Sequence, residues 1–165
     1  MDVSDSAWQS LVGGTIPAAL VEKGVDGFFV DNTDVYYQYP DTRIYQGLKT
    51  ILYGIAKYEM PVIINGGDTF VTAMIGKGET LPFTGVNQEG VFTTIEDYET
   101  DTFSTQTEEN RKYFQTYLKH CKEAGLDVYL LEYTVDTELM QEIADYAQEK
   151  GYSMYISATV GLDET

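Results

Sequence analysis

The sequence is poor in basic residues, and it contains one cysteine and one histidine. Ten Lys and Arg residues stand against 27 Asp and Glu residues, which leaves a formal net charge of −17. Binding to nucleic acid or to an anionic membrane surface requires clustered Lys and Arg, so the charge argues against both as partners. A single cysteine can form neither an internal disulfide nor a cysteine-based metal site. We expect Cys121 to be a buried thiol on a helix face.

Long hydrophobic runs are also absent. No apolar run reaches the roughly 18–20 residues that span a bilayer. The segment Met1–Asp5 has neither a basic region nor an apolar run, so we expect no signal peptide in this chain. No G-x-G-x-x-G motif follows the first predicted strand, which argues against a dinucleotide-binding Rossmann fold.

What the chain does contain is a folded core of about one domain's size. It has 165 residues, of which 43% are hydrophobic and 13% aromatic. This composition excludes a disordered chain, and we expect residues 1–165 to form a single domain.

The hydrophobic pattern predicts short strands that alternate with helices. Strands are predicted at Val25–Asp31, Pro61–Asn65, Thr84–Glu89, Asp127–Glu132 and Ser153–Ser157. Helices are predicted from Pro17 to Lys23, across Ile44–Ile55, after Asp68, from Thr107 to Gly125 and from Asp136 to Gly151. This alternation predicts right-handed crossovers and a parallel sheet, and therefore an α/β fold.

Polar residues follow nearly every predicted strand: Asp31-Asn32, Asn65, Asn87 to Glu89, and Glu132. Such strand ends are typical of the (β/α)8 TIM barrel, whose active site lies where the strands end. Eight βα units take about 250 residues, whereas about five are present here. We therefore expect strands four to eight of a barrel, which is a partial barrel; an open parallel sheet with two unpaired edges is the alternative.

Two of these strand-end acids, Asp31 and Glu89, form a candidate catalytic pair. Their strands are separated by one strand, which places the backbones roughly 10 Å apart at about 4.8 Å per step. Side chains that converge toward a barrel axis bring the carboxyl groups within about 5–9 Å, which covers both glycosidase geometries. The alternatives are an Asx turn at Asp31 and a solvated strand end at Glu89.

A third strand-end acid, Glu132, allows a magnesium site in principle, because hard cations prefer oxygen ligands. A metal-assisted enolising enzyme also needs a Lys or His base at a strand end. The lysines fall in helices or loops, and His120 lies in a predicted helix as a surface residue. The same lack of a placed histidine argues against Ser/His/Asp and Cys/His catalysis. We expect no metal and no cofactor.

Other polar and aromatic residues point to a sugar as the substrate. Gly66-Gly67 at a helix start is able to cradle a phosphate, but Asp68 follows and no base is near, which favours a turn where a substrate approaches the backbone. Tyrosines lie in loops after the strands, where they either stack on sugar rings or pack loop against loop. These tyrosines are Tyr36, Tyr37, Tyr39 and Tyr98.

Three motifs occur in order: Gly24–Asn32 (GVDGFFVDN), Asn65-Gly66-Gly67 and Asn87-Gln88-Glu89. Together they resemble glycoside hydrolase family 114, the endo-α-1,4-polygalactosaminidases and related barrel glycosidases. The resemblance covers most of the chain, from Trp8 to the terminal Leu162-Asp163. It implies a (β/α)8 barrel that cleaves α-1,4-linked galactosamine polymers.

The resemblance also implies roles for residues. Asp31 matches the family's catalytic aspartate on strand four, and Glu89 its catalytic glutamate on strand six. By analogy with α-galactosidase barrels, Asp31 is the nucleophile and Glu89 the general acid/base. An acidic cleft suits a polymer with cationic amines. We expect the polysaccharide or oligosaccharide substrate to contact Asp26, Asn32, Tyr36, Asn65, Asp68, Asn87 and Glu132.

The first three strands of the family pattern are missing from the sequence. Two explanations are open: the sequence is a fragment of a longer protein, or the chain completes its barrel by association. Self-association would also cover the open sheet edges. A second hypothesis is a catalytically inactive carbohydrate-binding or structural remnant of such a barrel. Family members are often exported, which implies an extracellular location for a full-length parent.

Overall fold

The structure, a computed structural model, describes residues 2–162. The chain divides into two compact units, Met1–Val86 and Asn87–Thr165, which we call unit 1 and unit 2. Asp163 of the terminal motif lies outside the described residues. Across the described part, no helix is both long enough and apolar enough to cross a membrane. The assignment of residues 1–165 to one domain stays a prediction.

All five predicted strands are present, in one sheet of order β1-β2-β3-β6-β7. They are β1 (Phe28–Val30), β2 (Val62–Asn65), β3 (Gly85–Glu89), β6 (Asp127–Tyr133) and β7 (Ser153–Ser157). The β1–β2 and β6–β7 pairs are parallel. The predicted α/β fold of the TIM-barrel type, with five strands, is thereby confirmed.

The first strand is shorter than the predicted Val25–Asp31. Its pairing with β2 begins where the Phe28 amide donates to the Pro61 carbonyl, at 2.8 Å. Proline has no amide hydrogen, so Pro61 offers only this acceptor to the neighbouring strand. Gly27 lies against Pro61 so closely that an added Cβ would be 2.7 Å from the same carbonyl oxygen. The strand therefore covers only the central residues of the apolar run.

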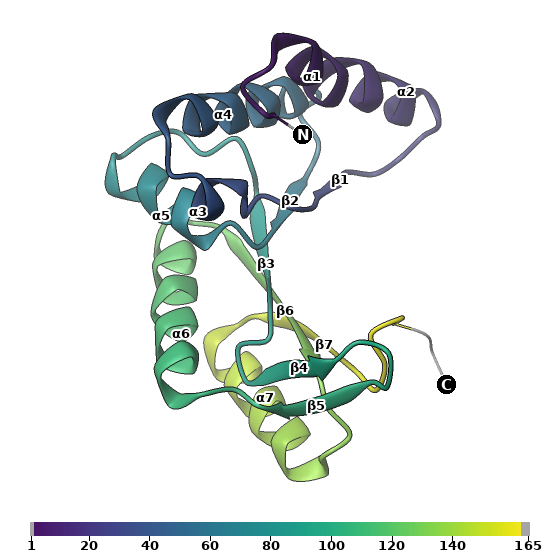
Figure 1. The fold of residues 1–165 in the computed structure, drawn as a ribbon, viewed down its shortest axis with the longest axis vertical. Helices are drawn as coiled ribbons and strands as arrows, with labels where there is room; N and C mark the ends of the chain where they lie inside the picture. Colours follow the sequence, from purple (N-terminus) through teal and green to yellow (C-terminus); the bar gives the residue numbers. More distant parts are fainter. Residues whose placement is uncertain (1, 163–165) are drawn as a thin grey trace. The chain divides into compact units, whose positions relative to one another are not determined.

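Unit 1 surrounds β1 and β2 with helices (Figure 1). These are α1 (Ser6–Ser10), the π-helical η1 (Leu11–Thr15), α2 (Ile16–Glu22), α3 (Val35–Gln38), α4 (Thr42–Ala56) and α5 (Asp68–Gly76). The core is built from Leu52 on α4, Ile64 on β2 and Phe70 on α5, all fully buried. Burial of such side chains drives the packing of helices onto the strands.

The first helical segment begins earlier than predicted. It starts at Ser6, where Asp5 accepts a hydrogen bond from the Trp8 amide, and it continues through η1 to Pro17. A Cβ on Gly54 of α4 would lie 2.4 Å from the Gly13 carbonyl oxygen of η1. Glycine at this crossing therefore allows the two helix backbones to touch.

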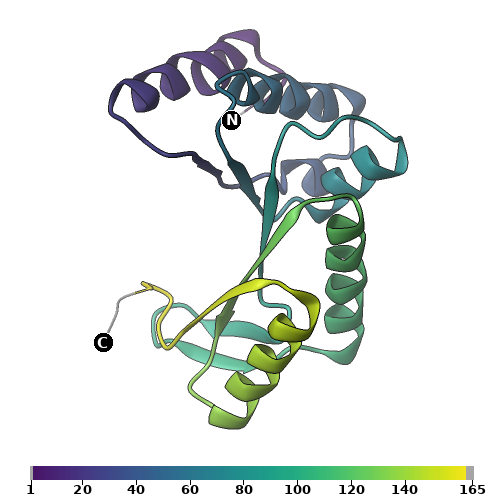
Figure 2. The same cartoon turned by 180° about the vertical axis from the view of Figure 1, so that it is seen from behind.

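Unit 2 contains α6 (Glu108–Glu123) and α7 (Thr137–Lys150) beside β6 and β7, and in Figure 2 the chain leaves α7 and returns as β7. The predicted caps are confirmed: Thr107 and Asp136 accept amide hydrogen bonds at the two helix starts, and α7 ends at Gly151 in the left-handed conformation. Cys121 is buried on α6, as predicted.

An antiparallel hairpin that the sequence analysis missed follows β3 (Figure 1). It consists of β4 (Thr93–Asp97) and β5 (Thr102–Thr105). Its sequence is mostly polar and acidic, so it lacks the apolar run by which the other strands are recognised. Phe103 packs onto Tyr133 of β6 with the ring centroids 5.7 Å apart, which anchors the hairpin to the sheet.

Candidate functional site

In unit 1, the first predicted catalytic residue, Asp31, directly follows β1. Its carboxylate accepts a hydrogen bond from the Asn65 side-chain amide at 2.9 Å, and another from Asn32 at 3.2 Å. Asn65 is the last residue of β2, the strand next to β1. Parallel neighbouring strands end at the same edge, and this brings the two side chains together. Two amide donors therefore hold the Asp31 carboxyl group in one direction.

Asp31 also faces a cavity of about 470 Å3 within unit 1. Trp8 of α1 and apolar side chains of α4 also line this cavity. Asp31 itself is solvent-exposed. The carboxylate is thus held in place and accessible at the same time.

The Gly66-Gly67 turn serves the contact between two strand-end loops. Both glycines adopt left-handed backbone conformations, with φ of 66° and 74°. The Gly67 amide donates to the Asp34 carboxylate at 2.9 Å, and Thr33 Oγ1 donates to the Asn65 carbonyl at 2.8 Å. The space next to these glycines is therefore filled by the chain's own Thr33 and Asp34. The approach of a substrate to the backbone at this turn stays a prediction.

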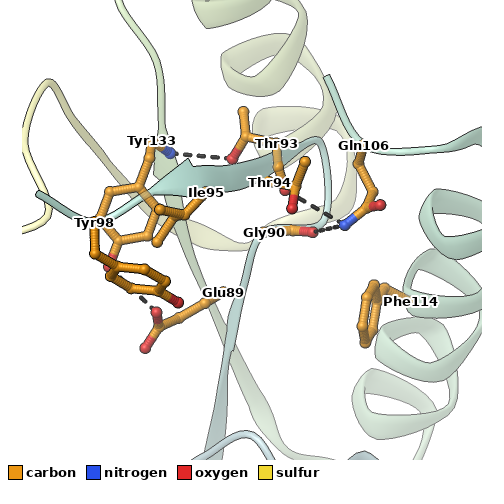
Figure 3. Close-up of a pocket in the computed structure, with 9 residues that line it drawn as sticks. All are labelled: Glu89, Gly90, Thr93, Thr94, Ile95, Tyr98, Gln106, Phe114 and Tyr133. Carbon is orange, nitrogen blue, oxygen red and sulfur yellow. Dashed lines mark hydrogen bonds between the residues drawn. The ribbon is translucent and has the colours of Figure 1, made fainter. Parts of the chain in front are cut away.

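In unit 2, the second predicted catalytic residue, Glu89, ends β3 and lines a pocket of about 210 Å3 (Figure 3). The β4–β5 hairpin supplies Tyr98 to this pocket, α6 supplies Phe114, and β6 supplies Tyr133. In Figure 3 the Glu89 carboxyl group points toward the rings of Tyr98 and Tyr133. The pocket thus combines a carboxyl group with aromatic surface that also carries hydroxyl groups.

The hydroxyl of Tyr133 donates a hydrogen bond to Glu89 Oε2 at 3.2 Å. Burial, with the negative charge of Glu89 as a second cause, raises the pKa of Tyr133 above its ordinary value. The Tyr133 hydroxyl therefore stays protonated across the physiological range. The hydrogen bond fixes one oxygen of Glu89 and leaves the group at the pocket wall.

Glu132, a predicted substrate contact, is 0% exposed. Its Oε1 accepts from the amides of Val91 and Phe92, at 2.8 and 3.1 Å. Its Oε2 accepts from the amides of Phe92 and Thr93, both at 3.1 Å, and from Thr93 Oγ1 at 2.7 Å. Burial raises the pKa of Glu132 to about 7, while these hydrogen bonds act in the opposite direction. The side chain binds the turn after β3 and presents no surface to a substrate.

The remaining predicted substrate contacts lie in different places. Asn32 follows Asp31 with φ of 61°, and Asn87 is buried on β3 on the same face as Glu89. Asp68 is the first residue of α5, where a negative charge also favours the helix dipole. Tyr36 packs against Tyr45 and Phe70, with ring centroids 5.4 and 6.2 Å apart, so it packs within unit 1.

Asp26 does not join the Asp31 cluster. It lies in a bend before β1, whereas Asp31 directly follows the strand, so the two acids stand at opposite ends of β1. The two ends of a strand open onto opposite edges of a parallel sheet, so the structure does not bring Asp26 together with Asp31. A contact of Asp26 with the substrate stays a prediction.

The residues that hold Glu89 escaped the sequence analysis. The Tyr133 hydroxyl donates to Glu89, and Thr93 Oγ1 donates to Glu132. The Gln106 side-chain amide donates to the Gly90 carbonyl at 3.1 Å. Their only sequence signal was position, because Tyr133 directly follows the predicted strand-end acid Glu132. Among residues 2–162, no group of three or more His, Cys, Asp or Glu side chains is placed to hold a metal ion.

No protein-family model matches this sequence, and no curated protein matches it at a significant level. Solved structures do share its fold. The glycoside hydrolase domain of PelA from Pseudomonas aeruginosa matches with a TM-score of 0.77 and 19% identity, over 99% of this chain and 64% of that domain. A variant of the same domain with a glutamate-to-alanine substitution matches with a TM-score of 0.73 and 17% identity, over 99% of this chain and 64% of that domain.

Ega3 of Aspergillus fumigatus, solved in complex with galactosamine, matches with a TM-score of 0.69 and 14% identity. The match covers 99% of this chain and 61% of Ega3. The chain therefore has the fold of known glycoside hydrolase domains, and it spans less than two thirds of their length.

Proposed function

We propose that this chain belongs to an endo-acting glycoside hydrolase that cleaves α-1,4-linked galactosamine-type polysaccharide. The observation that carries the proposal is the placement of Asp31 and Glu89, each at the carboxyl end of a strand in a fold shared with glycoside hydrolase domains. In barrels of this type, catalytic residues come from the ends of several strands. Each carboxyl group is also oriented by a neighbouring donor, Asn65 or Tyr133.

Two carboxyl groups are sufficient for this chemistry. Asp31 attacks the anomeric carbon as the glycosidic bond breaks, and protonated Glu89 gives its proton to the departing oxygen. A glycosyl ester on Asp31 results. Water then attacks the same carbon, Glu89 takes the water proton, and the ester bond to Asp31 breaks. The net reaction is hydrolysis with retention of the anomeric configuration.

The charge of the chain supports a cationic sugar polymer as the substrate. The net charge of −17 attracts a chain that carries protonated amines and repels an anionic one. Ega3, one of the similar structures, was solved with galactosamine. The pocket beside Glu89 adds exposed Tyr98 as a stacking surface.

A second candidate function is sugar binding without turnover. The observation that favours it is the length of the match, because the chain spans 64% of the PelA domain and residues 2–162 form a main sheet of five strands where a closed barrel needs eight. Such a remnant retains the strand-end donors and the tyrosine-lined pocket. It would bind oligosaccharides and release no new reducing ends.

The deciding experiment incubates the purified chain with soluble α-1,4-galactosamine oligomers and measures new reducing ends. We expect turnover by the wild type and none by Asp31→Asn or Glu89→Gln. Glu99→Gln is the matched control, since Glu99 is an exposed acid on the adjacent hairpin. Unchanged turnover in Glu89→Gln would refute the assigned role. Binding without turnover in the wild type selects the second candidate.

The stereochemistry gives an independent check on Asp31. Proton NMR of the first products shows which anomer forms before mutarotation. The α-anomer corresponds to the retaining reaction, in which Asp31 carries the sugar. The β-anomer corresponds to inversion and assigns Asp31 the activation of water.

A further inference from the structure

We infer that Glu132 is a positioning residue for Glu89, acting through the turn Gly90–Thr93, which we call the 90–93 turn. The inference rests on the proposed function, in which Glu89 is the acid/base. Glu132 is fully buried and accepts five hydrogen bonds from this turn. It never meets the substrate, so its role is distinct from that of Glu89.

The 90–93 turn is a place where the chain reverses tightly right after Glu89. Gly90 has φ of 64°, and a Cβ there would lie 2.8 Å from the Thr93 carbonyl oxygen. In such a turn, consecutive amides point inward, where they need acceptors once water is excluded. The Glu132 carboxylate supplies acceptors for the amides of Val91, Phe92 and Thr93 at once.

Three consecutive residues of β6 hold this turn together. The Leu131 carbonyl accepts from the Gly90 amide at 3.0 Å, and the Glu132 side chain binds the next three amides. The Tyr133 amide then donates to Thr93 Oγ1 at 3.1 Å. The backbone that carries Glu89 is therefore tied to β6 at every residue from 90 to 93.

The same strand reaches the Glu89 carboxyl group itself. Tyr133 follows Glu132 directly, and its hydroxyl donates to Glu89 Oε2. Thr93 Oγ1 links the two interactions, because it donates to Glu132 and accepts from the Tyr133 amide. If residue 132 no longer accepts these hydrogen bonds, the main chain after Glu89 loses a constraint. The strand that carries Tyr133 loses one as well. The direction of the Glu89 carboxyl group then changes.

A simpler role, in which Glu132 only stabilises unit 2, makes a different prediction. Loss of stability lowers the amount of folded protein and leaves kcat per folded molecule unchanged. Loss of positioning lowers kcat with KM little changed, because the proton transfer needs a fixed geometry. Misplacement of a catalytic group by about 1 Å costs up to about a hundredfold in rate.

The test compares Glu132→Gln, Thr93→Val and Thr93→Ser with the wild type, using Glu149→Gln as a surface control. Glu149 is an exposed acid on α7 paired with Lys150. Glutamine keeps the shape of Glu132 and places an amide donor against amide donors, and valine removes only the Thr93 hydroxyl. Folded protein is quantified by circular dichroism, and kcat and KM are then measured on galactosamine oligomers.

We expect kcat to fall about tenfold to a hundredfold in Glu132→Gln and Thr93→Val, with KM within about twofold. Thr93→Ser, which keeps the hydroxyl, restores most of the rate. Equal kcat per folded molecule in all variants would overturn the inference. If Glu132→Gln fails to fold, the pair Thr93→Val and Thr93→Ser decides by itself.

A second readout needs no activity and separates this inference from the proposed function. The carboxyl carbon of Glu89 is followed by NMR in 13C-labelled protein and assigned with Glu89→Gln. We expect its resonance to shift or broaden in Thr93→Val and to remain unchanged in Glu149→Gln. If the wild type releases no reducing ends but the Glu89 resonance still shifts in Thr93→Val, the proposed hydrolase function is refuted and the positioning role is supported. An unmoved resonance refutes the positioning role whatever the activity.

Discussion

Asn65 donates a hydrogen bond from its side-chain amide to Asp31 Oδ1 over 2.9 Å, and so joins the ends of β1 and β2. The bond links residues 34 positions apart in the sequence. It gives the proposed nucleophile a fixed direction, and it is a contact between two residues that the sequence analysis had already named.

Replacing Asn65 with alanine is expected to lower kcat about tenfold to a hundredfold. A hydrogen bond to a charged group contributes about 1.5–3 kcal/mol, and here it orients the attacking carboxylate. The measurement is the rate of reducing-end release at saturating oligomer. Gln141→Ala serves as the control, because the Gln141 side-chain amide donates to the Asp145 carboxylate at 2.8 Å on the exposed face of α7. Equal rates in the two variants would contradict the role of Asn65.

Glu132 should make the stability of unit 2 depend on pH. The pKa of Glu132 is raised by burial from 4.5 to about 7, so between these values the folded state binds more protons than the unfolded state. Its stabilising effect is complete below pH 4.5 and is lost as the pH rises through about 7. The full span corresponds to about 3 kcal/mol.

This pH dependence is measured by urea unfolding at pH 5 and pH 8 in the wild type and in Glu132→Gln. The difference in free energy of unfolding between the two proteins should change with pH, because glutamine does not titrate. A constant difference across this range would show that Glu132 keeps one protonation state.

Gly67→Ala should destabilise unit 1 by about 2–4 kcal/mol. The new Cβ would lie 2.4 Å from Thr33 Oγ1, and alanine would have to adopt φ of 74°. Gly78→Ala is matched in backbone conformation, with φ of 63°, but meets nothing within 4 Å. It should cost about 1 kcal/mol. Chemical denaturation of both variants separates the steric cost from the backbone cost, and equal losses would exclude the Thr33 contact.

Tyr98→Ala should weaken oligosaccharide binding about fivefold to tenfold and leave stability unchanged. Tyr98 is 70% exposed at the edge of the Glu89 pocket, so its ring is available to a sugar and adds little to the core. Calorimetric titration in a Glu89→Gln background avoids cleavage during the measurement. Tyr155→Ala, at an exposed tyrosine of β7 that does not line the pocket, is the control. The same loss in both variants would indicate non-specific stacking.

Self-association through open sheet edges stays a prediction, and β1 allows a direct test. In the sheet order, β1 pairs with β2 alone, and Phe29 on this strand is 59% exposed. Phe29→Lys places a charge on the edge and should shift any dimer to monomer in sedimentation velocity. Tyr37→Lys, at an exposed residue of α3 outside the sheet, should have no effect.

Much of the fold was predictable because its signals are local. The apolar stripe at Ile51 and Ile55 predicted α4, and the capping residues Thr107 and Asp136 marked two helix starts that the structure confirms. The β4–β5 hairpin was missed because its strands carry few apolar residues and are stabilised by contacts to β6, such as Phe103 on Tyr133.

The sequence by itself determined the five strands of the main sheet to within a few residues, and that acids and amides stand near their carboxyl ends. Short-range periodicity and capping encode these features, so no distant residue is needed to recognise them. Only the tertiary structure decided what each acid does. Asp31 is exposed beside Asn65, whereas Glu132 is enclosed by the 90–93 turn, although both were predicted as strand-end acids. Exposure and hydrogen-bond partners depend on residues about 30 to 40 positions away, and such pairings are made only when the sheet assembles.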